Sequence, residues 1–476
     1  MRFWRILTLL LVVAVAGINL WRTGLAAWHW DRSPAAAQAI VWLPALSALF
    51  AVAFAWLIGA LLTGLLWPRR GETALVLAVG AGVGLGVTSL LFHVASRLSA
   101  QPMAVAFPAE LLLGCGLLFL WLRKMRAVPP PPAAVPPARS WLGSVVRMVF
   151  AVSGAIALYS LWITWRAAPA ELCGGTLPGQ LPLVPAGTAR TLAYSDTTAH
   201  VAAGLGSAGF SLATLALLVA GVNRLRNRLI ALTGGLVLLG TPFFSRFTMV
   251  EHADVPFGFF LLAATVLMSV ARDENDRGLL FLAGLAAGLT AWIKPEGLVF
   301  CLALGLVFGL AQLRPRLWRN LPPLFGGLAL MLVPLFWLGS PLPSAGPLAQ
   351  LGDGSRHALL FQAWWRDLPH FGEWYSLPFF VLALHLVGPG RGWLERRTVV
   401  AAALLLVLLT GCAAAWLLGP ADLAEHLAGS LARLLMQVWP AAVFLWCLLA
   451  VRVVPAAGQT SPAESPVDSA PSGRPA

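Results

Sequence analysis

The stretch MVEHADVPFGFF, residues 249–260, places two acids and an imidazole between two apolar runs. Charged side chains make up only 11% of the chain, so residue types that could carry chemistry are few and their positions matter. If a helix begins near residue 251, Glu251 and Asp254 share one of its faces and His252 points elsewhere. Pro256 suits the first turn of such a helix. The alternative interpretation is a simple acid-capped helix start, because carboxylates are favourable at a helix N-terminus.

A second polar site is AWIKPEGLVF, residues 291–300, where Lys294 and Glu296 separate two apolar segments. The chain has only two lysines, Lys124 and Lys294, against 30 arginines. A compact ammonium group is not interchangeable with a guanidinium, so one lysine at this position indicates a specific role. A plain interhelical hairpin at Pro-Glu-Gly is the alternative.

Two further acids lie in the long connection at residues 166–198, which carries Glu171 and Asp196. His200 follows directly, and Asp196 and His200 are four positions apart, so they can pair if this stretch is helical. The alternative for both acids is solvation in an exposed loop.

The last polar site is ADLAEHLAGSLARLLMQVWP, residues 421–440, which contains His426 and Arg433. Arg433 falls about one turn inside the membrane edge, where a guanidinium needs a carboxylate or a lipid phosphate as its partner. A separate connection at 340–375 contains Trp-Trp-Arg-Asp at 364–367, a set that can lie flat on a membrane interface.

The elements that must position these residues are predicted to be membrane helices. The chain is 59% hydrophobic with a mean hydropathy of +0.81, and apolar runs near helix-spanning length recur throughout it. We therefore predict an all-α polytopic membrane protein with about 14 transmembrane helices. The expected segments are 4–21, 41–67, 73–95, 106–122, 147–165, 199–221, 229–247, 254–271, 278–293, 297–313, 321–339, 376–389, 398–418 and 430–451.

The distribution of basic residues predicts the orientation. With the N-terminus inside, the cytoplasmic connections hold 22 Lys and Arg residues and the opposite side holds 10. This asymmetry follows the positive-inside rule, so the net charge of +13 reflects helix ends and not a nucleic-acid-binding surface. The four polar sites then all fall at the extracytoplasmic edge, as expected of an enzyme that acts on a lipid-linked substrate.

Composition divides the chain into four parts. Residues 1–123 are predicted to form an N-terminal four-helix membrane unit, and residues 124–146 a Pro-rich basic cytoplasmic linker. Residues 147–452 form the main membrane core, and the Pro/Ser-rich residues 453–476 are predicted to be a disordered tail. The first apolar segment also fits a secretory signal, but we expect a retained spanning helix.

HADVPFGFFLLAATVLM, followed by LLFLAGLAAGLTAWIKPEGLVF, resembles the GT-C superfamily of membrane glycosyltransferases, in the branch of protein mannosyltransferases and aminoarabinose transferases. DLAEHLAGSLARLLMQVWP is similar to the closing segment of a bacterial branch of that superfamily. The resemblance implies a GT-C-like core that starts near residue 147, with Asp254 in the second outer acidic motif. The first outer loop here begins WRAAPAELCGG and lacks the paired acids of that branch.

The resemblance also implies a reaction. A sugar moves from a polyprenyl-phosphate donor to an extracytoplasmic glycan, lipid or protein acceptor by inverting displacement, at a bacterial inner membrane. Asp254 would position substrate or a divalent metal ion, Lys294 would contact the phosphate, and Glu171 or Asp196 would act as the base. Glu251, His252, Glu296, His200, Arg433 and His426 are expected substrate-binding residues.

Two other functions remain open from the sequence. One is a catalytically degenerate relative that binds lipid-linked glycans, because the first-loop acids are atypical. The other is a lipid or glycan transporter, which would more typically carry ionisable residues near the bilayer midplane and an inverted repeat. Neither of those transporter features is evident in the sequence.

Overall fold

The architecture is a bundle of helices, given by a computed structural model. It describes residues 42–67, 72–125, 181–195, 200–241, 253–274, 276–311, 321–338, 348–368, 395–419 and 422–449, and the isolated positions 148, 151, 154, 155, 244 and 371. Within these residues the chain forms 13 α-helices and no strand, which confirms the all-α prediction. The helices are α2 (Trp42–Leu66), α3 (Thr73–Leu98), α4 (Pro102–Met125), α6 (Leu183–Ser195), α7 (His200–Leu225), α8 (Arg228–Leu239), α10 (Asp254–Glu274), α11 (Arg277–Thr290), α12 (Glu296–Ala311), α13 (Leu321–Trp337), α14 (Gly354–Asp367), α16 (Arg396–Leu417) and α17 (Leu423–Leu449).

The predicted number of about 14 transmembrane helices is not confirmed. Seven of the described helices are long and apolar enough to cross a membrane, namely α2, α3, α4, α7, α10, α16 and α17. Helices α8, α11, α12 and α13 are apolar but have only 12 to 17 residues, which is less than the ~20 residues that span a bilayer. The predicted segments 4–21, 147–165 and 376–389 lie wholly or almost wholly outside the described residues.

The shortening has a local cause at the junction of α11 and α12. The amides of Trp292 and Ile293 donate to the carbonyls of Leu289 and Thr290, so Ala291–Ile293 form tight turns. These residues are apolar and were therefore counted within the segment 278–293. Hydropathy indicates which residues are apolar and therefore buried. A buried turn and a buried helix are both apolar, so hydropathy alone does not distinguish them.

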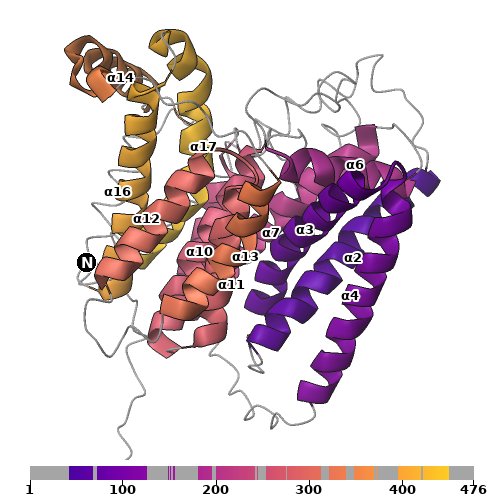
Figure 1. Cartoon of the computed structure of the whole chain (residues 1–476). Helices are drawn as coiled ribbons and strands as arrows, with labels where there is room; N and C mark the ends of the chain where they lie inside the picture. Colours follow the sequence, from indigo (N-terminus) through magenta and orange to yellow (C-terminus); the bar gives the residue numbers. More distant parts are fainter. Residues whose placement is uncertain are drawn as a thin grey trace, which may run out of the picture.

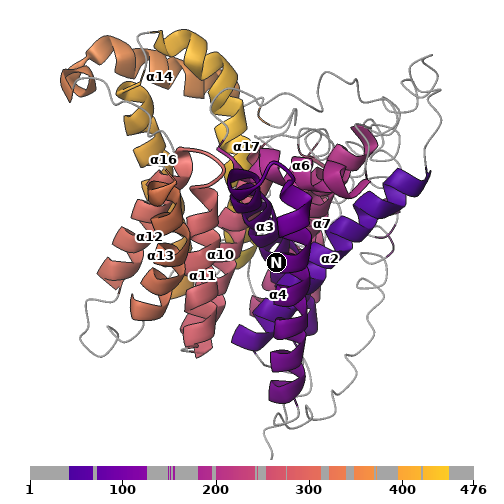
Figure 2. The same cartoon turned by 45° about the vertical axis from the view of Figure 1, so that its right-hand side comes forward.

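Two helices appear in connections where no apolar segment was predicted. Helix α6 lies within the connection 166–198, and α14 lies within the connection 340–375. Figures 1 and 2 show both at the same end of the bundle, with α14 crossing beyond the ends of α16 and α17. This end also holds the starts of α10, α12 and α17, where the predicted polar sites lie.

Small residues bring the helices together. A Cβ atom on Gly59 of α2 would lie 1.9 Å from the carbonyl oxygen of Gly80 in α3, and one on Gly84 would lie 1.9 Å from that of Ala55. Helices α11 and α13 meet in the same way at Gly284. Such backbone-to-backbone packing is typical of membrane helices, where dispersion replaces the hydrophobic effect as the main attraction.

Helix α10 lies at the centre of the bundle and packs against α7, α11, α16 and α17. All residues of its span Asp254–Ala271 are buried. The rings of Phe259 and Phe260 form an edge-on cluster with Phe210 of α7. Asp254, the first residue of α10, is therefore held in a rigid setting.

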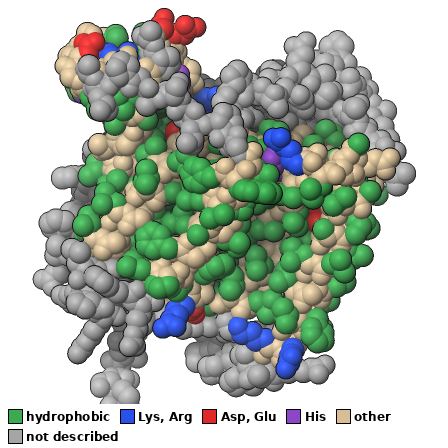
Figure 3. Space-filling model, in the orientation of Figure 1, with side chains coloured by type: hydrophobic (Ala, Val, Ile, Leu, Met, Phe, Trp, Pro, Cys, Tyr) green, Lys and Arg blue, Asp and Glu red, His purple; other side chains and the backbone are tan. Residues whose placement is uncertain are grey.

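Helices α2, α3 and α4 pack on one another, and α3 also packs on α6 and α7. The division into a unit at 1–123, a linker at 124–146, a core at 147–452 and a tail at 453–476 stays a prediction. Figure 3 shows hydrophobic side chains across the middle of one face of the molecule, with Lys and Arg at its lower end and a smaller group near the upper one. This belt agrees with a multi-pass membrane protein.

Candidate functional site

Asp254 is the centre of a buried cluster of polar side chains at the start of α10. Its carboxylate is fully buried and accepts hydrogen bonds from three side chains. Lys294 Nζ lies 2.6 Å from Oδ1, Gln437 Nε2 lies 2.7 Å from Oδ1, and Arg433 Nε lies 2.9 Å from Oδ2. The predicted carboxylate thus pairs with two cations from other elements, so its role is not limited to capping the start of α10. We call these four residues the Asp254 cluster.

Lys294 reaches the cluster because it follows the tight turns between α11 and α12. Trp292 fixes this turn by donating its Nε1 hydrogen to the carbonyl of Met331 in α13, 2.8 Å away. The ring of Trp292 also meets His93 of α3 edge-on, with the centroids 6.0 Å apart. The turn is therefore held by neighbours on two sides, and the Lys294 ammonium has a defined position.

Arg433 and Gln437 reach the cluster from α17, where they are four positions apart and share a face. The two helices come close at this point, since a Cβ atom on Gly258 of α10 would lie 3.0 Å from the carbonyl oxygen of Gln437. Gln437 is buried, and its Oε1 has no hydrogen-bond partner in the part of the chain that the structure describes. The amide therefore orients the carboxylate and leaves one acceptor available.

The cluster holds two positive groups and one negative group, so its formal charge is +1. Exposure differs between the cations: the Arg433 side chain is 28% exposed, against 9% for Lys294. Among the described residues, only Nε of Arg433 binds Asp254, and the terminal guanidinium nitrogens can contact a ligand. The geometry suits an anion that approaches from the Arg433 side.

The structure places the other predicted site residues differently. Glu296 begins α12 and is half-buried, with no ion pair among the described residues. His426 is exposed in the first turn of α17 and meets the ring of Trp416 edge-on. Neither is hydrogen-bonded to the Asp254 cluster. His200 begins α7, and the remaining candidates, Glu171, Asp196, Glu251 and His252, lie outside the described residues.

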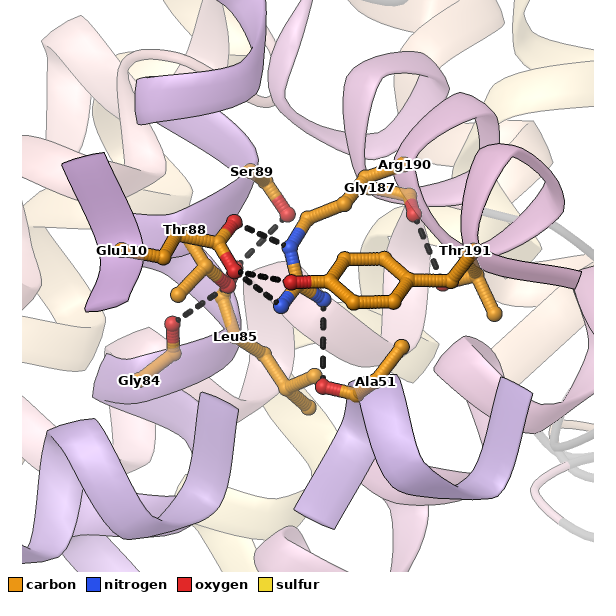
Figure 4. A network of polar contacts seen from close by, with 10 residues as sticks. Ala51, Gly84, Leu85, Thr88, Ser89, Glu110, Gly187, Arg190 and Thr191 are labelled. Carbon is orange, nitrogen blue, oxygen red and sulfur yellow. Dashed lines mark hydrogen bonds and ion pairs between the residues drawn. The ribbon is translucent and has the colours of Figure 1, made fainter. Parts of the chain in front are cut away.

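A second buried polar network lies between α4 and α6, and the sequence analysis did not identify it (Figure 4). Arg190 Nε lies 2.6 Å from Glu110 Oε1, and Arg190 Nη2 lies 2.7 Å from Glu110 Oε2. Tyr194 donates its hydroxyl to Glu110 Oε2 at 2.8 Å. Burial and the neighbouring Glu110 carboxylate raise the pKa of Tyr194, so its hydroxyl remains a donor. Glu110 inside an apolar segment was the one available sequence signal.

The described residues do not fit a divalent metal ion at Asp254. Both carboxylate oxygens are bound to cationic or amide donors. In the part of the chain that the structure describes, no group of three or more His, Cys, Asp or Glu side chains is arranged to hold a metal. The Asp254 carboxylate therefore binds the two cations and Gln437, and not a metal ion, in this arrangement.

Residues 195–337 match the family model described as dolichyl-phosphate-mannose-protein mannosyltransferase. This part of the chain is similar to a family of membrane glycosyltransferases. The resemblance seen in the motifs is thereby confirmed. No curated protein and no solved structure gives a significant match.

The region that matches the mannosyltransferase family runs from the end of α6 through α13. It contains Asp254 and Lys294, while Arg433 and Gln437 come from α17, beyond the match. The mannosyltransferase-like region thus supplies the carboxylate and the lysine, and the last helix completes the cluster.

Proposed function

We propose that this chain transfers a sugar from a polyprenyl-phosphate donor to an acceptor at the extracytoplasmic face of a bacterial inner membrane, and that the Asp254 cluster binds the donor phosphate. Arg433 is the outer cation and contacts the phosphate first, with Lys294 behind it. Asp254 holds the two cations at a fixed separation and keeps them from repelling each other. The family supports the donor class, and the cluster supports the place where the donor binds.

The observation that carries this proposal is the convergence of Lys294 and Arg433, from two separate elements, on one buried carboxylate. A purely structural ion pair needs one cation per carboxylate, and a second one leaves an excess positive charge at a membrane edge. Burying such a charge is unfavourable unless an anion accompanies it for part of the time. A phosphate on a lipid that lies in the same membrane meets this requirement.

The proposed reaction is a single displacement. An acceptor hydroxyl oxygen attacks the anomeric carbon while the bond from that carbon to the phosphate oxygen breaks, and the bonding electrons leave with the phosphate. The products are an inverted glycoside and a free polyprenyl phosphate. The two cations stabilise the charge that develops on the leaving oxygen. The hydroxyl proton goes to a carboxylate, for which Glu171 and Asp196 stay the candidates.

The orientation of the site is part of the proposal. Arginines gather at the end of the bundle opposite the Asp254 cluster, including Arg224 at the end of α7, Arg228 at the start of α8 and Arg277 at the start of α11. By the positive-inside rule this end is cytoplasmic. The cluster then faces the extracytoplasmic side.

Binding of undecaprenyl phosphate to the purified protein in detergent tests the site. We expect Arg433→Ala and Lys294→Ala each to weaken binding by about 10-fold or more, because each removes a charge-assisted hydrogen bond of about 1.5–3 kcal/mol. Arg366→Ala is the matched control, since Arg366 is an exposed arginine paired with Asp367 in α14. Its affinity should equal that of the wild type.

Release of polyprenyl phosphate from polyprenyl-phosphate mannose, followed with the same variants, tests the reaction. We expect turnover to fall in Arg433→Ala and Lys294→Ala and to be unchanged in Arg366→Ala. Wild-type affinity in both cluster variants would refute the proposed phosphate site. Binding of the lipid without any release of product would favour the degenerate relative that the atypical first loop suggested.

A further inference from the structure

The Glu110–Arg190 pair connects three helices, α2, α4 and α6 (Figure 4). Arg190 binds both carboxylate oxygens of Glu110 in α4, and its Nη1 donates to the carbonyl of Ala51 in α2, 3.2 Å away. The guanidinium also lies over the ring of Tyr194, 4.9 Å from its centroid. One side of α6 is thus fastened to the N-terminal helices by a fork of hydrogen bonds.

This pair is completely enclosed. Glu110 is 0% exposed and Arg190 is 1% exposed. A buried ion pair contributes little net stability over apolar side chains of the same volume, whereas its geometry is demanding and specific. Its presence therefore indicates that the position of α6 matters beyond the stability of the bundle.

The start of α6 is bonded to the turn that carries Lys294. The amide of Leu181 donates to the carbonyl of Ile293 at 3.0 Å, and the amide of Leu183 donates to the carbonyl of Trp292 at 3.1 Å. These two carbonyls immediately precede Lys294 in the chain. Displacement of α6 along its axis would thus move the backbone that directly precedes Lys294.

Close packing of α6 against α3 couples the position of Arg190 to the position of the Lys294 turn. A Cβ atom on Gly187 would lie 2.6 Å from Ser89 Oγ of α3, so α6 sits directly against α3 between its two attachments. The α6 backbone from Leu183 to Ser195 is continuous helix, and helices resist compression. The pair at Arg190 and the bonds at Leu181 and Leu183 are accordingly parts of one rigid element.

We infer that Arg190 and Glu110 are positioning residues for the donor phosphate, acting through α6 on the Lys294 turn. This inference rests on the proposed function, which assigns Lys294 to the donor phosphate. It assigns a role in the reaction to helices α2–α4, which lie outside the region that matches the mannosyltransferase family.

Hydrogen–deuterium exchange and lipid binding, measured on the full chain in detergent, test this inference. The variants are Arg190→Lys, which loses the bidentate fork, and Glu110→Gln, which keeps the shape of the side chain and is measured alongside in case one of them does not fold. The matched control is Glu72→Gln, which breaks the Arg224–Glu72 ion pair at the other end of the bundle.

In the Arg190 and Glu110 variants we expect faster exchange of the peptide at 288–297, with exchange of α16 unchanged. Affinity for undecaprenyl phosphate should fall between about 2-fold and 30-fold, the range for substitutions that act on a site without contacting its ligand. In a Lys294→Ala background the Arg190 substitution should have no further effect on affinity, because Arg190 acts through Lys294. The Glu72 control should change neither readout.

Unchanged exchange at 288–297 in a folded variant would overturn the inference, as would an equal loss of affinity with and without Lys294. A merely structural role predicts that equal loss, since lower stability would affect both backgrounds alike. A failure of the proposed function would give a different result. Lys294→Ala would then bind undecaprenyl phosphate as tightly as the wild type, whereas the Arg190 and Glu110 variants would still show faster exchange at 288–297.

Discussion

At the scale of single residues, Asp254 shows how an ionised side chain is accommodated in an apolar bundle. Its carboxylate is enclosed, and both oxygens are bound by donors that belong to α17 and to the Lys294 turn. An unpaired carboxylate at this depth would be costly to bury. The acid and its partners therefore stabilise each other as a set, and removal of any member exposes the rest to that cost.

Substitution of the acid should reveal this dependence. We expect Asp254→Asn to lower the free energy of unfolding by about 3–5 kcal/mol, because it leaves Lys294 and Arg433 facing each other without a counter-charge. Chemical unfolding in detergent micelles measures the loss. Asp367→Asn, which breaks the exposed pair with Arg366, is the control and should cost about 1 kcal/mol or less. Equal losses in both variants would contradict a buried cluster.

Sequence reasoning found the charged members of the cluster and missed the neutral one. Asp254, Lys294 and Arg433 could be predicted because a charged side chain in an apolar segment is costly and therefore indicates a functional site. Gln437 carries no charge and lies in a helical run, so nothing in its surroundings marked it. Arg190 was missed because it lies in a connection, where an arginine is expected to be solvated.

At the scale of elements, the helices inside apolar runs were predictable, and those inside connections were not. The α6 sequence, LVPAGTARTLAYS, contains proline, glycine and threonine, which disfavour helix in isolation. Its helix therefore depends on tertiary contacts that no local pattern records. Helix α14 did carry a signal, since Asp353 precedes it and accepts a hydrogen bond from the Ser355 amide as an N-cap.

Substitution of a glycine at a helix crossing should destabilise the protein more than substitution of a glycine on an open face. A Cβ atom on Gly284 would lie 2.0 Å from the carbonyl oxygen of Leu324, so we expect Gly284→Leu to separate α11 from α13. The loss should be at least about 1–3 kcal/mol, the typical cost of overpacking. Thermal unfolding measures it. Gly309→Leu is the control, because a Cβ atom there has no neighbour within 4 Å. Similar melting temperatures for the two variants would contradict the close crossing.

At the scale of the whole molecule, the orientation in the membrane can be tested directly. We expect a cysteine placed at Ser355, exposed on α14, to react with a membrane-impermeant maleimide in intact cells. A cysteine at Arg228, exposed at the opposite end, should react only after permeabilisation. The background replaces Cys115, which is exposed, and Cys173, while the other free cysteines are buried. The reverse labelling pattern would place the Asp254 cluster on the cytoplasmic side.

The membrane class could be predicted from the chain as a whole, because hydropathy is a property of long stretches, whereas the family resemblance came from short motifs around Asp254 and Lys294. The number of spans could not, because four apolar helices have only 12 to 17 residues, and the turn that ends α11 is itself buried. The joining of α2–α4 to α6 and α7 was also beyond the sequence. It depends on glycine contacts and on the Glu110–Arg190 pair, whose members are 80 positions apart.

The wide separation of the Asp254 partners along the chain bears on how the protein is made. Lys294 follows Asp254 by 40 residues, and Arg433 follows it by 179. A ribosome therefore releases the acid into the membrane long before it supplies the second cation. The proposed phosphate site is complete only when the last helix has been translated and docked, so we expect an incomplete nascent chain to bind the lipid donor weakly.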